Sequence, residues 1–207
     1  MIIEVCANSY ESAINAEQGG ADRIELCKDL YLDGLTPTYE TAKKTIDELN
    51  IPVFILIRPR EGDFNYSNEE YELMKADIVK FKEMGCKGIV SGVLNDDKTI
   101  DIERTKELVE LSRPLEFTFH RAFDIVSDPF KEIENLIELG IDRVLTSGQE
   151  EIAVDGLELL KKLAKVVANR IKIMPGSGIT LNNYHSFIKN KFAEIHGSFQ
   201  DGIPKIK

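Results

Sequence analysis

Short apolar runs and amphipathic stretches alternate along this chain from end to end. Eight apolar runs have the length of strands, and the first three are dense in β-branched and large apolar residues, as strands covered by helices are. The predicted strands are residues 2–6, 23–27, 53–58, 88–91, 115–120, 143–147, 171–174 and 193–196.

The stretches between these runs have the spacing of helices with one apolar face. The clearest covers residues 68–85. Another begins at Asp128-Pro129, an N-cap followed by a proline at the first helical position, and ends at Gly140. Further helices of this kind are predicted over residues 36–49, 157–167 and 180–187.

Strand–helix alternation over about eight units predicts an α/β fold, and specifically a (β/α)8 TIM barrel formed by residues 1–207 as one domain. After the last predicted strand the chain has only residues 197–207, which include Gly202 and Pro204. That segment is too short for a normal eighth helix, so we expect the helix to be missing or replaced by a short tail. A second subunit could cover the resulting groove, and we therefore expect a homo-oligomer.

Composition narrows the possible partners. The 207 residues are 43% hydrophobic, enough for a well-buried core, and the net charge is −10. Lys and Arg are scattered, so neither nucleic acid nor a membrane is an expected partner. Three cysteines with no C-x-x-C spacing favour a reducing compartment. No signal peptide and no apolar run of ~18 residues is found, which predicts a cytoplasmic protein.

Two predicted strands repeat one pattern, Ile3-Glu4-Val5-Cys6 and Ile24-Glu25-Leu26-Cys27. A carboxylate and a thiol two residues apart point to the same side of a strand. If these strands are neighbours, two carboxylates and two thiols converge on one region. Cys6 and Cys27 could then hold a soft metal ion, Cu(I) or, with further ligands, Zn(II).

In a barrel of this kind, chemistry lies at the carboxyl ends of the strands. The candidate acid–base residues there are Glu4, Glu25 and His120. A small anion, phosphate or carboxylate, could be clamped by Arg58 and Arg60 and by backbone N–H groups of the glycine-rich loops. The full set of candidate anion-binding residues is Arg23, Arg58, Arg60, Arg121, Asp124, Thr146, Gly176, Gly178 and His196.

The residues alone leave three interpretations open. The chain could bind Cu(I) through Cys6 and Cys27. It could be an enzyme acting on a small anionic metabolite with Glu and His as acid–base groups. The charged residues inside the barrel could instead be a salt-bridge cluster that only supports the fold.

Several long motifs closely resemble the CutC copper-homeostasis family. They are EVC at 4–6, GADRIELC at 20–27, GLTP at 34–37, IRPR at 57–60, GDF at 62–64, YS at 66–67, TFHRAFD at 118–124 and VLTSGQ at 144–149. The resemblance covers nearly the whole chain. It implies a cytoplasmic TIM barrel linked to copper handling, with Cys6 and Cys27 as Cu(I) ligands.

The sequence departs from the family pattern at three places. Glu61 stands where the family usually has a second glycine, and Gly197 stands where Ser or Cys often follows the histidine. The C-terminal segment is shorter than usual by about one helix. The last difference bears on subunit packing in this chain.

Overall fold

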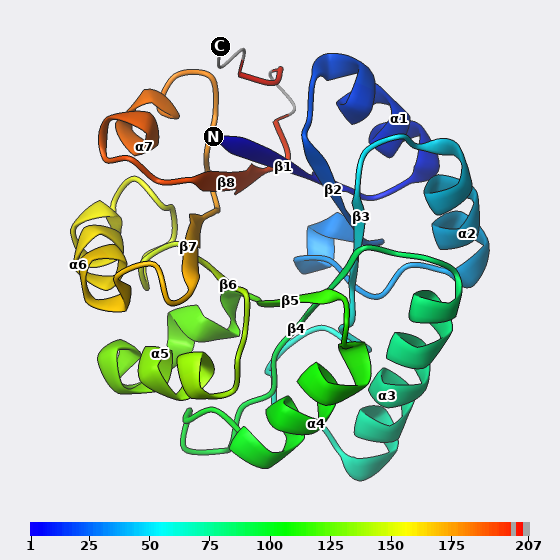
Figure 1. Cartoon of the computed structure of the whole chain (residues 1–207), viewed down its shortest axis with the longest axis horizontal. Helices are drawn as coiled ribbons and strands as arrows, with labels where there is room; N and C mark the ends of the chain where they lie inside the picture. Colours follow the sequence, from blue (N-terminus) through cyan, green and yellow to red (C-terminus); the bar gives the residue numbers. More distant parts are fainter. Residues whose placement is uncertain (200–201, 205–207) are drawn as a thin grey trace.

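The computed structural model describes residues 1–199 and 202–204. Eight parallel strands form one sheet that curls into a nearly closed barrel, as predicted (Figure 1). The strands are β1 (Ile2–Ala7), β2 (Arg23–Leu26), β3 (Val53–Leu56), β4 (Gly88–Ser91), β5 (Glu116–Phe119), β6 (Arg143–Thr146), β7 (Lys172–Pro175) and β8 (Glu194–Gly197). Each lies within two residues of its predicted bounds.

The strand order is β7-β6-β5-β4-β3-β2-β1-β8, so β1 lies between β2 and β8. In the part of the chain that the structure describes, β7 and β8 meet through a single bridge, Gly176 with His196. The barrel is therefore closed by its weakest pairing there. In β1 and β2, Glu4 pairs with Arg23 and Cys6 pairs with Glu25, which places the repeated Glu and Cys positions on one face.

Helices surround the barrel. They are α1 (Tyr10–Gly19), α2 (Tyr39–Glu48), α3 (Asn68–Glu83), α4 (Ile102–Ser112), α5 (Pro129–Glu138), α6 (Leu157–Val167) and α7 (His185–Lys189), with short 3-10 turns η1 (Leu30–Leu32) and η2 (Arg121–Ile125). The caps explain where several begin. Ser67 and Glu70 form a capping box on α3, and the Asp128 side chain accepts two backbone hydrogen bonds at the start of α5.

The apolar pattern did not predict α1 or α4. In α1 the buried residues are Ala13 and Ala16, which are too small to produce an apolar stripe. In α4 two of the four buried residues, Thr105 and Ser112, are polar. The helix expected over 180–187 begins only at His185, because the Asn183 side chain accepts from Thr180 N–H and residues before it form turns.

The core lies between the barrel and the helices. Ile3, Val5, Ile24 and Ile55 are buried there with the apolar faces of the helices. Each such side chain contributes about 1.5–3 kcal/mol on burial. Alternate strand positions point into the barrel, and these carry the charged residues.

Among residues 198–199 and 202–204 no helix follows β8. The described part of this tail runs between α7 and α1 (Figure 1). Ile203 packs on the core and stands so close to Gly19 that an added Cβ would lie 2.8 Å from its Cδ1. Within these described residues, the predicted absence of a normal eighth helix is confirmed. In the described residues we found no helix with the length and apolarity that a bilayer crossing requires.

Candidate functional site at the mouth of the barrel

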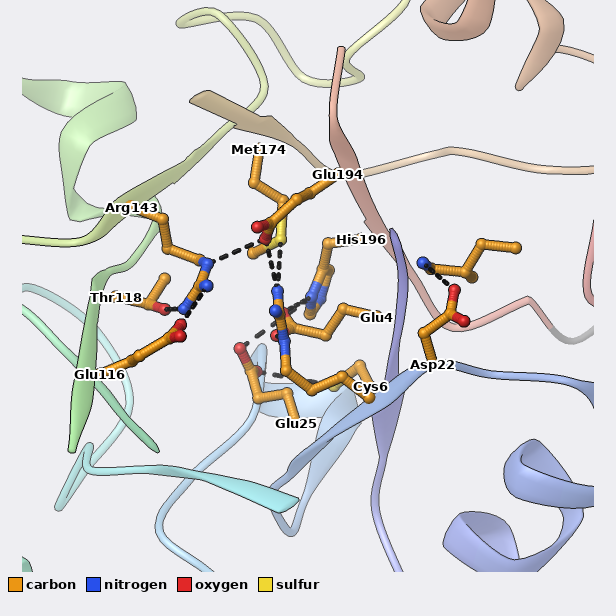
Figure 2. Close-up of polar contacts among 12 residues, drawn as sticks. Glu4, Cys6, Asp22, Glu25, Glu116, Thr118, Arg143, Met174, Glu194 and His196 are labelled. Atoms are coloured by element: carbon orange, nitrogen blue, oxygen red, sulfur yellow. Dashed lines mark hydrogen bonds and ion pairs between the residues drawn. The ribbon is translucent and has the colours of Figure 1, made fainter. Parts of the chain in front are cut away.

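A network of charges fills the barrel interior beneath its mouth (Figure 2). Arg23 joins two carboxylates, with its Nε 2.5 Å from Glu4 Oε2 and its Nη2 2.6 Å from Glu194 Oε2. Arg143 reaches the same Glu194 oxygen at 2.9 Å and also contacts Glu116. Buried charges are tolerated only when they are paired in this way. Each of these buried charges therefore has a partner of opposite charge within the protein.

Above it, Glu4 connects the network to His196. Glu4 Oε1 accepts a hydrogen bond of 2.8 Å from His196 Nδ1. Burial by itself raises the pKa of Glu4, but the charge of Arg23 and the His196 hydrogen bond outweigh it, and the pKa falls to about 2. Glu4 is therefore a carboxylate at neutral pH. It fixes a proton of His196 on Nδ1, so Nε2 is the ring nitrogen that Glu4 does not engage.

Glu25 has the opposite character. The residue is 4% exposed, and its Oε2 has no hydrogen-bond partner among the described residues. Burial raises the pKa of Glu25 to about 7, the charge of Glu4 adds to the effect, and His196 opposes it. Two carboxylates on neighbouring strands thus differ strongly in proton affinity, which is the arrangement that acid–base chemistry requires.

Burial and the neighbouring charges have opposite effects on the pKa of His196. Burial alone lowers the pKa of the imidazole, but the charge of Glu25 and the hydrogen bond to Glu4 raise it above its usual value. His196 Nδ1 lies 4.0 Å from Glu25 Oε2. His196 therefore stands between a permanent carboxylate and one that exchanges its proton near neutral pH.

The two thiols predicted to converge do so. Cys6 Sγ and Cys27 Sγ are 3.5 Å apart, and Cys6 Sγ lies 3.9 Å from Glu25 Oε1. Cys27 is fully buried, whereas Cys6 is 8% exposed. The hydrogen bond with Cys27 and burial raise the pKa of Cys6, so without a metal it is a thiol.

These groups open onto a cavity of about 520 Å³ at the carboxyl ends of the strands. Eight of the predicted site residues line it: Cys6, Glu25, Arg58, His120, Arg121, Asp124, Gly178 and His196. Six others do not: Glu4, Arg23, Cys27, Arg60, Thr146 and Gly176. Glu4 and Cys27 lie directly behind the lining, in contact with His196 and Cys6, and Arg23 lies one step deeper, paired with Glu4.

The structure does not bring Arg58 and Arg60 together as a clamp. Arg60 instead pairs with Glu70, in the first turn of α3, and with Asp63, three residues further along the chain, at 2.7 and 2.8 Å. Arg58 remains in the cavity wall, 5% exposed. Its terminal nitrogens donate to backbone carbonyls, while its Nε has no partner among the described residues.

His120 is also in the wall. Its Nδ1 accepts from Ala122 N–H at 3.3 Å, and its Nε2 has no partner in the described part of the chain. Burial, together with the charge of Arg58, lowers the pKa of His120 to about 3. The ring is therefore neutral and offers a hydrogen-bond donor rather than a charge.

The remaining predicted residues have structural partners. Asp124 accepts from Thr146 Oγ1 and from backbone N–H groups after β6, and it pairs with Arg121 at 2.8 Å. Gly176 lets β7 approach β8, since a Cβ there would lie 3.2 Å from His196 Cβ. Gly178 has φ +64 and lines the cavity at a turn where a side chain would meet Ile152.

Several cavity residues were missed by sequence reasoning. Leu30 and Asp33 come from the loop after β2, and Ile179 comes from the loop after β7. Loops carry no periodic signal, so no pattern could place them. Arg143 was also missed as an interior charge, although it has the same parity along β6 as the inward-facing Leu145.

The donor set suits a metal. One ligand atom each from Cys6, Glu25 and His196 lies within 4.8 Å of the others, and Cys27 adjoins Cys6. Two thiols and an imidazole are soft to borderline ligands, of the kind that select Cu(I) or Zn(II) over Mg²⁺ or Ca²⁺. The imidazole whose other nitrogen donates to a carboxylate is the usual second layer of such sites.

Comparisons with known proteins point to one family. The model of the CutC family matches residues 1–201. The human copper homeostasis protein cutC homolog is 48% identical over 198 residues, which are 95% of this chain and 72% of the human protein. The crystal structure of the putative copper homeostasis protein CutC from Streptococcus agalactiae superposes with a TM-score of 0.91 at 32% identity, covering 96% of this chain and 99% of that one.

A more distant structure, titled QR15, an aldolase, has a TM-score of 0.71 at 16% identity, covering 96% of this chain and 89% of that chain, and shows the shared fold alone. The family model and the relatives, by contrast, extend over nearly the whole chain. On these grounds the chain belongs to the CutC family of copper homeostasis proteins.

Proposed function

We propose that the mouth of the barrel binds Cu(I) through Cys6 and Cys27. The observation that carries the proposal is the 3.5 Å separation of the two Sγ atoms, from positions 21 residues apart. His196 Nε2 is the third donor in this proposal, because Glu4 already occupies Nδ1. Cys6 faces the cavity and Cys27 lies behind it, so the ion enters from the cavity side.

Binding requires the thiols to lose their protons. Two thiols and one Cu(I) give a bis-thiolate complex with net charge −1 and release two protons. Glu25 lies 3.9 Å from Cys6 Sγ and has a pKa of about 7, so it can accept the Cys6 proton and pass it to solvent. His196 would coordinate as the neutral imidazole, with its one ring proton on Nδ1 donated to Glu4.

Anaerobic competition with a Cu(I) chelator tests the proposal. The Cys6→Ser, Cys27→Ser double variant should lose affinity by about 100-fold or more, since both ligands are removed. Cys86→Ser is the matched control, because Cys86 is equally buried but precedes β4 at the opposite end of the barrel. Equal competition by the double variant and the wild type would contradict the proposal.

We also propose a cytoplasmic location and a homo-oligomer. Free thiols that bind Cu(I) need a reducing compartment, and the cytoplasm supplies one. Among the described residues no helix follows β8, and we propose that a second copy covers the flank between α7 and α1. Cell fractionation tests the first point. Sedimentation tests the second, and a monomer at micromolar concentration would count against it.

A second candidate function is an enzyme acting on a small anionic molecule. It is favoured by one observation: Glu25 lines the cavity with a carboxyl whose pKa is about 7 and whose Oε2 has no hydrogen-bond partner in the described residues. A carboxyl poised near neutral pH can take and return a proton. In this proposal Glu25 transfers the proton, Glu4 positions His196, and Arg58 and His120 contact the substrate.

A thermal-shift screen of small anions against wild type, Glu25→Gln and Arg58→Ala tests the enzyme proposal. A substrate should raise the melting temperature of the wild type, and Arg58→Ala should abolish the shift. Product formation from that ligand should stop in Glu25→Gln. Turnover that persists in Glu25→Gln would remove Glu25 from the chemistry.

A further inference from the structure

Two hydrogen-bond donors in the cavity wall have nothing to bind. His120 is 5% exposed, and its Nδ1 is occupied as an acceptor by Ala122 N–H. A neutral imidazole that accepts at Nδ1 carries its proton on Nε2. That Nε2–H has no acceptor among the described residues, and leaving a buried donor unpaired is costly.

The second donor is Arg58 Nε–H. The rest of the guanidinium is held by the carbonyls of Leu32, Gly34 and Gly62, at 2.8, 3.1 and 3.2 Å. These bonds fix the orientation of Arg58 but supply no negative charge. Its Nε, on a side chain that is 5% exposed, has no partner in the described part of the chain.

Arg58 also differs from the other arginines in charge pairing. Among the described residues, seven of the eight arginines form an ion pair with a carboxylate: Arg23, Arg60, Arg104, Arg113, Arg121, Arg143 and Arg170. Arg58 has none in that part of the chain. A buried positive charge without a counter-ion points to an anion that comes from outside the chain.

Phe64 places the two donors in the same part of the cavity. Its ring centroid is 4.8 Å from that of His120 and 5.1 Å from Arg58 Cζ. The charge of Arg58 also contributes to keeping His120 neutral. Both donor side chains therefore lie against one aromatic ring in the cavity wall, and Arg58, Phe64 and His120 are called the corner below.

We propose that this corner binds the carboxylate of a small monocarboxylic acid, with Arg58 Nε–H and His120 Nε2–H as its donors. Two donors match the two oxygens of a planar carboxylate. A phosphate dianion would bring more charge into a cavity whose lining already includes Glu25, Asp33, Asp63 and Asp124. The structure therefore favours a single negative charge on the ligand.

The rest of the cavity fits an apolar body. Leu30, Leu56, Leu145 and Ile179 contribute to its lining, and its volume of about 520 Å³ exceeds what a carboxylate alone needs. Glu25 and His196 line the same cavity, so a ligand held at the corner would share it with the proton-exchanging group. The inference rests on the second candidate function and names its substrate class.

Calorimetric titration with butyrate tests the inference, with butyramide as the uncharged analogue of the same shape and inorganic phosphate as the competing anion. Wild type should bind butyrate at least about tenfold more tightly than either. His120→Leu should reduce butyrate affinity by about tenfold or more, and His120→Gln, which restores an N–H donor, should recover part of it. Arg58→Gln is a less specific test, because it also removes the hydrogen bonds from Arg58 to the backbone carbonyls of the surrounding loops.

Arg60→Gln is the matched control, since Arg60 lies two residues from Arg58 but does not line the cavity. The butyrate affinity of this variant should stay within about twofold of wild type. Equal binding of butyrate and butyramide, tighter binding of phosphate, or no measurable binding of butyrate would overturn the inference. So would equal losses in Arg60→Gln and His120→Leu. Butyrate binding that persists in a Glu25→Gln variant without turnover separates failure of the enzyme proposal from failure of this one.

Discussion

Glu25 should destabilise the folded protein at neutral and alkaline pH, and Glu25→Gln should relieve this cost. The folded-state pKa is about 7, against 4.5 for an unperturbed carboxyl. The folded protein therefore holds the Glu25 proton through a pH range in which the unfolded chain has lost it. Stability falls as pH rises above 4.5, and the loss levels off once pH has passed the folded-state pKa of about 7.

The difference from 4.5 to about 7 corresponds to roughly 3 kcal/mol at 1.36 kcal/mol for each pH unit. Gln is close to Glu in shape, and its carbonyl can still accept from Cys6 Sγ. Removing the charge also withdraws part of the support for protonated His196, which reduces the gain. We therefore expect Glu25→Gln to be more stable than wild type by about 1–3 kcal/mol at pH 8.

Urea unfolding of both proteins at intervals from pH 5 to pH 8 measures this effect. The difference in unfolding free energy should be under about 1 kcal/mol at pH 5 and should grow toward pH 8. Glu4→Gln is the matched control with the opposite sign: Glu4 has a pKa of about 2 and partners Arg23, so its loss should destabilise at neutral pH. A Glu25→Gln variant that is equally stable or less stable than wild type across the whole range would refute the reasoning.

Two further predictions test the charged interior and the His120 corner. Arg143→Met should cost about 3–5 kcal/mol of unfolding free energy in urea, because it leaves buried Glu194 with one fewer partner. Arg170→Met removes an exposed ion pair and should cost under about 1 kcal/mol. Similar costs for the two variants would show that charge pairing does not hold the interior network together. Gly92→Ala should weaken butyrate binding severalfold and leave Cu(I) binding unchanged, because its Cβ would stand 2.9 Å from the His120 ring; unchanged butyrate affinity would place the ligand away from that ring.

The strand pattern predicted much of the site because side chains alternate with a period of two inside a strand. That rule placed Glu4, Glu25 and His196 on the inner face, and the structure brings them together. It also predicted the thiol pair from the repeat in β1 and β2. Register between neighbouring strands then follows from closing the barrel.

The rule fails where the strand ends. Arg60 lies beyond β3, which ends at Leu56, and its direction is decided by local carboxylates that parity does not describe. Asp33 reaches the cavity through a loop in which Asp29 and Asp33 adopt left-handed backbone conformations. Such turns depend on tertiary contacts, including the bonds from Arg58 to this loop.

Proton affinity could not be predicted from sequence either. Glu4 and Glu25 occupy equivalent positions of the same repeated pattern, yet one has a pKa of about 2 and the other about 7. The difference arises because Glu4 pairs with Arg23 and His196, whereas Glu25 is buried and its Oε2 has no hydrogen-bond partner among the described residues. Only the three-dimensional arrangement separates the two roles.

Copper anomalous diffraction from crystals of the Cu(I)-loaded protein addresses the thiol pair most directly. We predict one peak bridging Cys6 Sγ and Cys27 Sγ beside the His196 ring, absent from the Cys6→Ser, Cys27→Ser variant. Copper located at another place on the chain, or a peak that survives in the double variant, would contradict the assignment of the barrel mouth as the copper site.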